Sequence, residues 1–144
     1  RIRPLILNKK MAKNVFLIFL VWAVSFLNCS AKSQSDRQSQ IQEALGDGNT
    51  TVLVSMMNSN VELTLPNSSD VHSKNQTKVI LDDFFNKNRP SNFLITHKTE
   101  NEKSGFIMGK LYTDKGSYNI NILLRKSDSP KFLIYQLRIE KSNE

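Results

Sequence analysis

The side chains best able to bind a small molecule or transfer a proton lie in the second half of the chain: His97, Tyr112, Tyr118 and Tyr135. A histidine can act as a general base near neutral pH, and tyrosine hydroxyls can hydrogen-bond a ligand inside a cavity. His97 alternates in phase with Phe93 and Ile95, so we expect these three side chains on one sheet face. A hydrogen-bonded histidine at the core margin, with tyrosines packed in the sheet, explains the same pattern without a ligand.

A second set of residues predicts a surface for a protein partner: Arg125, Phe132, Ile134, Gln136 and Arg138. Along the expected strand 132–140, the apolar and polar members of this set alternate in phase and therefore share one face. Arginine and aromatic residues are enriched at protein interfaces, so this face is a candidate contact for a second copy or another protein. A solvated face with cross-strand pairs, such as Arg125 with Glu140, is the alternative.

Motifs for metal binding, cofactor binding and nucleophilic catalysis are absent from the sequence. His72 and His97 are the two histidines, and neither stands beside an acidic cluster, whereas zinc and calcium sites need grouped ligands. The five glycines form no phosphate-binding loop, and no serine lies in a nucleophile elbow. We therefore expect no metal and no cofactor, and the sequence favours a protein that is not an enzyme.

The charge of the chain is concentrated at its start. The 144 residues carry a formal charge of +7, from 20 basic and 13 acidic residues. Residues 1–33 contain six of the basic residues and none of the acidic ones, so residues 34–144 have a net charge of only +1. Nucleic-acid binding needs a basic face that neutralises phosphates, and we therefore expect no nucleic-acid partner.

The same initial segment has the pattern of a secretory signal. Residues 15–27 are apolar and uncharged, with lysines before them and small residues after them. Because a membrane-spanning helix needs about 20 apolar residues, we interpret residues 1–33 as upstream residues plus a signal peptide, cleaved after Ala31 or Ser33. The protein is then exported, either periplasmic or secreted. Two alternatives remain open: an uncleaved anchor through residues 15–27, and lipidation of Cys29, the single cysteine.

The elements that must position the candidate residues follow from hydrophobic periodicity and from turn residues. A Ser/Gln-rich stretch over 34–40 is interpreted as a flexible segment, and 41–141 as a single domain. Ser35 and Gln38 form the pattern of a capping box, as do Ser73 and Gln76. The expected order is a helix to residue 45, a short helix over 52–57, a strand over 61–65, a polar loop over 66–72, a helix over 73–87, and strands over 93–97, 106–113, 118–125 and 132–140.

Segregated helices and strands indicate the α+β class. Tight turns between the last four strands predict an antiparallel meander. We expect one curved, mainly antiparallel sheet whose single covered face receives the apolar sides of the helices.

In its order of helices and strands, the chain resembles the cone-shaped nuclear-transport-factor-2-like (NTF2-like, cystatin-like) fold. It is also similar to a family of small exported bacterial proteins of unknown function. The residues that carry the likeness are 45–49, 73–76 before Phe84 and Phe85, 93–97, Gly109, and above all 136–140. The resemblance implies a fold and an envelope location but no activity, because the wider fold includes isomerases, dehydratases, ligand binders and dimeric adaptors.

These observations together favour a non-enzymatic envelope module. It would bind a small apolar ligand through His97 and the three tyrosines, or bind a homodimer partner or an envelope protein through its outer sheet face. The alternative is an isomerase or dehydratase of the same fold with His97 as its base. Such an enzyme needs an acid near His97, for which Glu62 and Asp70 are the candidates, although Glu62 alternates away from the apolar residues of its strand.

Overall fold

The computed structural model of the protein describes residues 33–128 and 130–143. The predicted signal peptide, the alternative anchor over 15–27 and Cys29 lie outside these residues. In chain order the elements are α2 (Ser33–Asp47), α3 (Thr50–Ser55), β1 (Met57–Leu65), β2 (Ser68–Ser73), α4 (Lys74–Lys87), β3 (Pro90–Glu100), β4 (Ser104–Thr113), β5 (Gly116–Lys126) and β6 (Phe132–Lys141). None of the helices in the described part of the chain has the length and hydropathy required to span a membrane.

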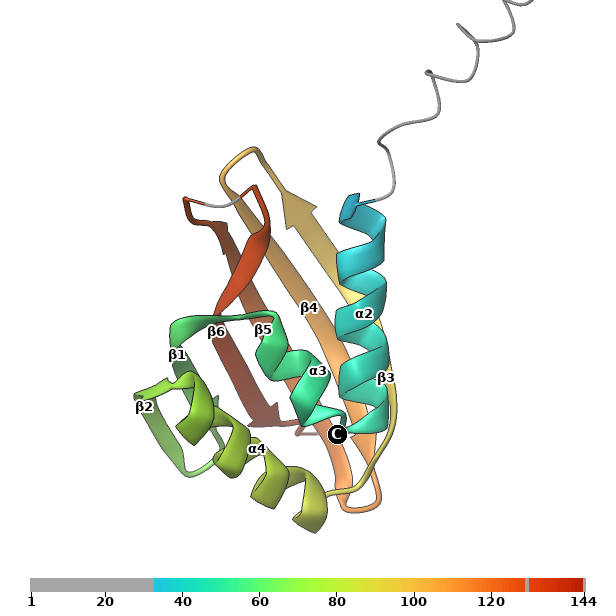
Figure 1. The fold of residues 1–144 in the computed structure, drawn as a ribbon. Coiled ribbons are helices and arrows are strands. Elements are labelled where there is room, and N and C mark those ends of the chain that lie inside the picture. Colours follow the sequence, from blue (N-terminus) through green and yellow to red (C-terminus); the bar gives the residue numbers. More distant parts are fainter. Residues whose placement is uncertain (1–32, 129, 144) are drawn as a thin grey trace, which may run out of the picture. The chain divides into compact units, whose positions relative to one another are not determined.

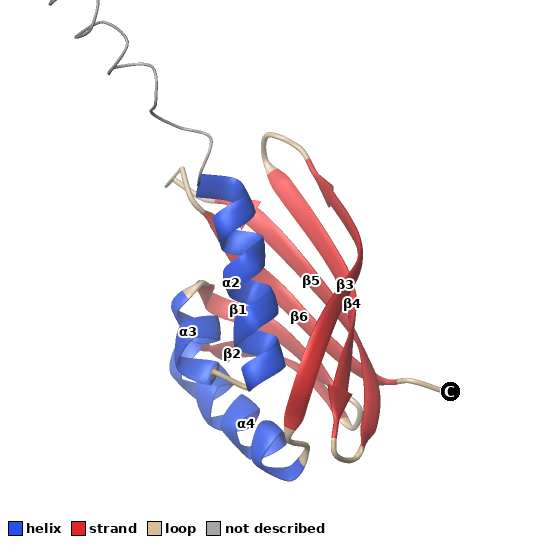
Figure 2. Cartoon of the chain, turned by 90° about the vertical axis from the view of Figure 1, so that its right-hand side faces the viewer, coloured by secondary structure: helices blue, strands red, loops and turns tan. Residues whose placement is uncertain are grey.

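The strands form one six-stranded sheet in the order β2-β1-β6-β5-β4-β3 (Figure 1). Strands β1 and β6 are parallel, and the other neighbours are antiparallel. The helices α2, α3 and α4 all lie on one face of the curved sheet, and Figure 2 shows the other face without a covering helix. This arrangement confirms the predicted α+β class and the four-strand meander at the end of the chain. We call the helix-covered side of the sheet the inner face and the opposite side the outer face.

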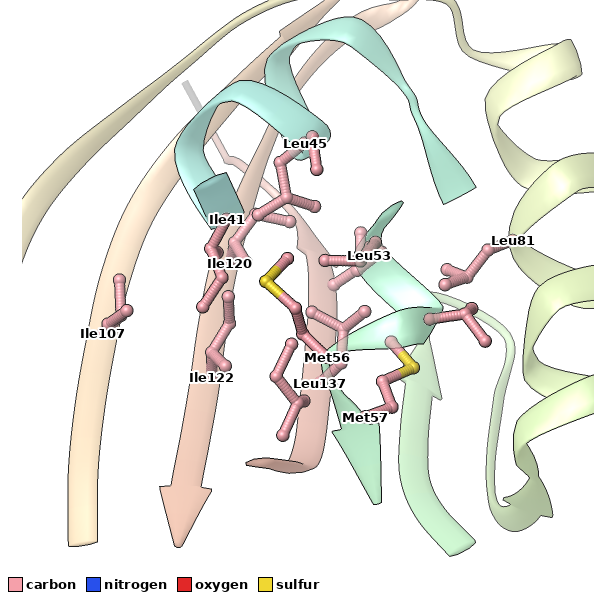
Figure 3. Close-up of a cluster of buried hydrophobic side chains, with 14 of the residues drawn as sticks. Ile41, Leu45, Leu53, Met56, Met57, Leu81, Ile107, Ile120, Ile122 and Leu137 are labelled. Carbon is pink, nitrogen blue, oxygen red and sulfur yellow. The ribbon is translucent and has the colours of Figure 1, made fainter. Parts of the chain in front are cut away.

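The core lies between the helices and the inner sheet face (Figure 3). Helical spacing in α2 buries Ile41 and Leu45, and Leu53 of α3 joins them. Alternate residues of β5, Ile120 and Ile122, meet them from the sheet. Each fully buried aliphatic side chain of this kind stabilises the fold by about 1.5–3 kcal/mol.

The starts of α3 and α4 are fixed by side-chain caps. The Ser73 hydroxyl accepts a hydrogen bond from the backbone nitrogen of Gln76 at 3.3 Å, and the Gln76 side-chain oxygen accepts one from the backbone nitrogen of Ser73 at 3.1 Å. This capping box confirms the prediction for α4. Asn49 caps the short helix α3 by accepting a hydrogen bond from the Val52 nitrogen at 3.1 Å.

The predicted elements differ most from the structure at three places, and several strand ends also differ by a few residues. The segment 34–40, interpreted as flexible, belongs to α2, and Gln38 accepts a hydrogen bond from the Lys98 ammonium of β3 at 3.0 Å. Met57, expected in the short helix, begins β1. The expected polar loop over 66–72 contains strand β2, which pairs with residues 60–65 of β1. An exposed edge strand needs no apolar alternation, because its pairing depends on backbone hydrogen bonds.

Candidate functional site

His97 lies on the outer face of the sheet, so the prediction that it shares a face with Phe93 and Ile95 is wrong. In the pairing of β3 with β4, Ile95 is opposite Gly109 but His97 is opposite Met108. Thr96 is therefore an extra residue in β3, and such a bulge reverses the alternation of all residues after it. The His97 side chain is exposed.

Neither acid proposed as a partner for His97 lies near it. Glu62 is in β1 and Asp70 is in β2, at the opposite edge of the sheet order from β3. A general base of the isomerase type needs a positioned acid and a cavity that excludes water. Among the described residues, the structure provides neither of these at His97.

A second bulge changes the predicted partner surface. Leu123 of β5 is opposite Gln136, but Leu124 is opposite Ile134, so Tyr135 is the extra residue of β6. As a result, Phe132 and Ile134 are buried in the core rather than exposed beside Gln136 and Arg138. The prediction is therefore wrong for these two residues. Tyr135 is half-buried, with its ring centroid 5.7 Å from the guanidinium carbon of Arg125.

The three tyrosines do not converge on one site. Tyr112 is exposed on the outer face of β4, and Tyr135 lies with Arg125 on the same side of the sheet. Tyr118 is buried on the inner face, where the end of α4 covers it. Only Tyr118 therefore belongs to a hollow between the helices and the sheet.

Tyr118 is held firmly by the last turn of α4. Its hydroxyl donates a hydrogen bond to Oδ1 of Asn88 at 2.7 Å. The Asn88 side-chain amide and backbone nitrogen both donate to the Phe84 carbonyl, at 3.0 and 2.9 Å, which closes the helix. The rings of Phe84 and Tyr118 pack edge to face, with centroids 5.2 Å apart. These contacts join the end of α4 to β5.

A groove of about 500 Å³ opens beside this contact. We call it the α4 groove, and its lining residues are Leu65, Pro66, Asn67, Ser68, Ile80, Asp83, Phe84, Lys87, Asn88, Tyr118 and Lys141. Its volume falls within the range of small-molecule sites, about 300–1,000 Å³. Of the predicted ligand residues, only Tyr118 lines it. Lys141 was not predicted, although it is the residue of β6 opposite Tyr118.

The charges around the α4 groove are unevenly paired. Lys87 forms an ion pair with Asp83 at 2.7 Å within α4. Lys141 forms no ion pair or side-chain hydrogen bond with any described residue. Among the described residues, the groove therefore has one cation, Lys141, without a paired acidic group.

The outer face carries the other candidate site. Leu94, Met108 and Tyr112 are 45%, 38% and 39% exposed on the adjacent strands β3 and β4. Half-buried Phe106 and Leu123 continue this apolar area toward β5. We call these five residues the outer patch.

Polar side chains border the outer patch on the β6 and β1 side. Gln136 donates a hydrogen bond to Glu62 at 2.9 Å, and Arg138 lies 3.6 Å from Glu140. Arg125, Gln136 and Arg138 therefore lie on the outer face, where the predicted partner surface was expected. Within the described ranges, no three His, Cys, Asp or Glu side chains gather into a group that could hold a metal ion.

The architecture defines the class of the protein as an NTF2-like α+β domain. A designed NTF2-like protein superposes with a TM-score of 0.59 at 13% identity, over 73% of this chain and 96% of that one. At this identity the likeness shows the fold alone. No curated protein matches the chain.

The chain belongs to the DUF4783 family, a domain of unknown function whose model matches residues 38–140. A DUF4783 structure from Bacteroides ovatus is 30% identical, with a TM-score of 0.69 over 73% of this chain and 94% of that one. One from Bacteroides fragilis is 31% identical, with a TM-score of 0.67 over 72% of this chain and 96% of that one. The family assignment agrees with the resemblance expected from the sequence, and it brings no activity with it.

Proposed function

We propose that the protein is an exported, non-enzymatic binding module that associates with a second copy of itself through the outer sheet face. The observation that carries this proposal is the outer patch. Three of the six exposed large hydrophobic side chains among the described residues lie there, on two adjacent strands. Exposed apolar area that is gathered on one face, with a polar rim, is typical of protein contact sites.

The outer face offers few features that suit a chemical reaction. His97 is exposed on it without an acid partner among the described residues. The outer patch lies on the uncovered side of the curved sheet, and Lys110 stands between its members Met108 and Tyr112 on β4. Enzymes usually enclose their substrates in a cavity lined by a few oriented polar groups. These features support a docking surface and argue against an isomerase or dehydratase centred on His97.

The charges on this face suit a second copy of the same chain. Arg125 lies toward one end of β5, and Glu140 of β6 is opposite Asn119 near the other end. Two copies packed face to face, with their strands running in opposite directions, bring Arg125 of one copy close to Glu140 of the other. The two-fold symmetry makes this contact twice, once on each side of the apolar centre.

Sedimentation equilibrium of the purified protein, in the form in which its cells process it, tests the association. We expect a dimer at micromolar concentration and a monomer for Met108→Glu, because each copy then places a charge in the apolar contact. Val79→Glu is the matched control: Val79 is 69% exposed on α4, and its substitution should leave the dimer intact. A wild-type protein that stays monomeric at millimolar concentration would refute self-association.

Charge reversal tests the orientation of the two copies. Arg125→Glu should weaken the dimer, because it places two acidic residues together at each end of the contact. The double variant Arg125→Glu with Glu140→Arg should recover part of the lost affinity. If the double variant dimerises no more tightly than Arg125→Glu alone, the antiparallel arrangement is wrong.

Export is part of the same proposal and has its own test. A basic start, a short apolar run and small residues at its end support secretion. Intact mass spectrometry of the protein from its own host should give an N-terminus at Lys32 or Gln34. A mass that includes residues 15–27 would indicate an uncleaved anchor, and a diacylglyceryl adduct on Cys29 would indicate a lipoprotein.

A further inference from the structure

We infer that the α4 groove binds a small anionic amphiphile, namely a medium-chain carboxylate. The inference concerns the inner face of the sheet and does not depend on association through the outer face. It joins three observations on the lining of the groove: an apolar wall, and, within the described part of the chain, a cation without an ion pair and two polar side chains without hydrogen bonds. Each of these observations corresponds to one part of such a ligand.

The apolar wall matches the hydrocarbon part of the ligand. Ile80 and Phe84 line the groove from α4, and Leu65 lines it from the end of β1. Ile80 and Leu65 are only partly buried, although they pack against the core. An acyl chain that covered them would remove more apolar surface from water, which is favourable by about 25 cal/mol per Å².

The cationic rim matches the carboxylate. Lys87 lies in the last turn of α4, where its charge complements the helix end and is already paired with Asp83. Lys141 lies across the groove on β6, with no partner among the described residues. The lining residues that are charged at neutral pH are two lysines and one aspartate, which favours an anion over a cation.

Two further donors stand at the same rim. Asn67, in the turn between β1 and β2, and Ser68, the first residue of β2, line the groove, and their side chains form no hydrogen bond within the described part of the chain. An amide NH₂ and a hydroxyl can each donate to a carboxylate oxygen. The Tyr118 hydroxyl already donates to Asn88, so it serves the site as a fixed wall.

The inference is tested by titrating the protein, as its cells process it, with decanoate below its micelle concentration. Calorimetry measures the affinity, and two-dimensional NMR reports which backbone amides shift. We expect saturable binding with shifts at residues 65–68, 80–88 and 141. Decanol, which is neutral, should bind about fivefold more weakly, and decyltrimethylammonium more weakly still.

Two variants localise the site. Lys141→Met removes the charge but keeps an apolar stem, so decanoate affinity should fall about fivefold while decanol affinity stays the same. Lys103→Met, in the exposed turn between β3 and β4, removes the same charge at a distance and should change neither affinity. Ser68→Trp fills the groove and should abolish binding of both ligands. Circular dichroism melting of each variant checks that it is folded.

Three results would overturn the inference. The first is the absence of saturable decanoate binding to the folded wild-type protein. The second is equal affinity for decanoate and decyltrimethylammonium, which would show detergent-like contact without charge selection. The third is decanoate binding that Lys141→Met and Ser68→Trp leave unchanged, which would place the ligand elsewhere.

Discussion

The ring of Phe93 occupies the space in which a Cβ atom at position 109 would stand. A Cβ built on Gly109 comes within 2.4 Å of the Phe93 ring and 2.5 Å of the Leu94 carbonyl oxygen. Gly109 pairs with Ile95 in the adjacent strand, so the Phe93 ring leans diagonally over it. A glycine in a strand interior is otherwise unfavourable, and the aromatic ring covers the backbone that it would expose.

Gly109→Ala is therefore expected to destabilise the protein by about 3 kcal/mol, because both a ring and a backbone carbonyl must move. Urea unfolding followed by circular dichroism measures the change. Gly105→Ala, in the same strand, is the matched control: its Cβ would meet nothing closer than 3.5 Å. We expect the control to cost less than about 1 kcal/mol.

A double-mutant cycle separates the ring from the backbone. In a Phe93→Leu background, Gly109→Ala should cost less than it does in the wild type, because the smaller side chain can move aside. Equal costs in the two backgrounds would show that the Leu94 carbonyl alone excludes the methyl group.

Thr77→Val is expected to stabilise the protein. Thr77 is fully buried in α4, and its hydroxyl has no hydrogen-bond partner among the described residues. Valine has nearly the same shape and a similar helix propensity, so removing the unsatisfied hydroxyl should gain about 1 kcal/mol in thermal or urea unfolding. Thr77→Ser keeps the hydroxyl but loses the methyl group, and it should destabilise. A loss of stability in Thr77→Val would show that the hydroxyl is satisfied in solution.

Asp82 links the stability of the helical layer to pH. The Lys78 ammonium at 2.7 Å, followed by the Thr50 hydroxyl, holds the pKa of this carboxyl below its ordinary value of 3.8. Because the folded pKa is the lower one, ionisation favours the folded state above pH 3.8, and this contribution is lost as the pH falls below it. Asp82→Asn should therefore reduce the free energy of unfolding at about pH 7 and have less effect at about pH 3.

Asp83→Asn is the control for this pH dependence, because it removes the same charge one residue further along α4. Urea unfolding of the wild type and both variants at the two pH values gives the comparison. If the difference between wild type and Asp82→Asn is the same at both values, the carboxylate does not contribute through its ionised form.

The sequence predicts the elements of this fold better than the direction of its side chains. The capping box at Ser73 and the alternation in the last four strands depend on neighbouring residues, so periodicity reveals them. The bulges at Thr96 and Tyr135 depend on how two strands are paired, and each one reverses the alternation beyond it. For this reason simple alternation places His97 on the wrong face and Ile134 on the outer face.

The α4 groove could likewise not be predicted from the sequence, because tertiary packing brings its lining residues together. Tyr118 could be proposed from its residue type, but Asn88 and Lys141 become its neighbours only when α4 crosses the end of the sheet. Strand β2, which contributes Ser68 to the groove, has no apolar alternation that would reveal it. The end of a helix at Asn88, two residues before Pro90, is the one local signal that points to this end of the groove.

The outer patch and the α4 groove lie on opposite faces of the sheet, so we expect them to act independently. Met108→Glu should prevent the dimer and leave decanoate affinity within about twofold of the wild type. Lys141→Met should weaken decanoate binding and leave the dimer intact. Sedimentation equilibrium and calorimetry on both variants and on the double variant provide the full comparison. If Met108→Glu also changes decanoate affinity by more than about twofold, the core between the two faces couples the two sites. Decanoate binding in the groove then depends on whether the protein is a dimer.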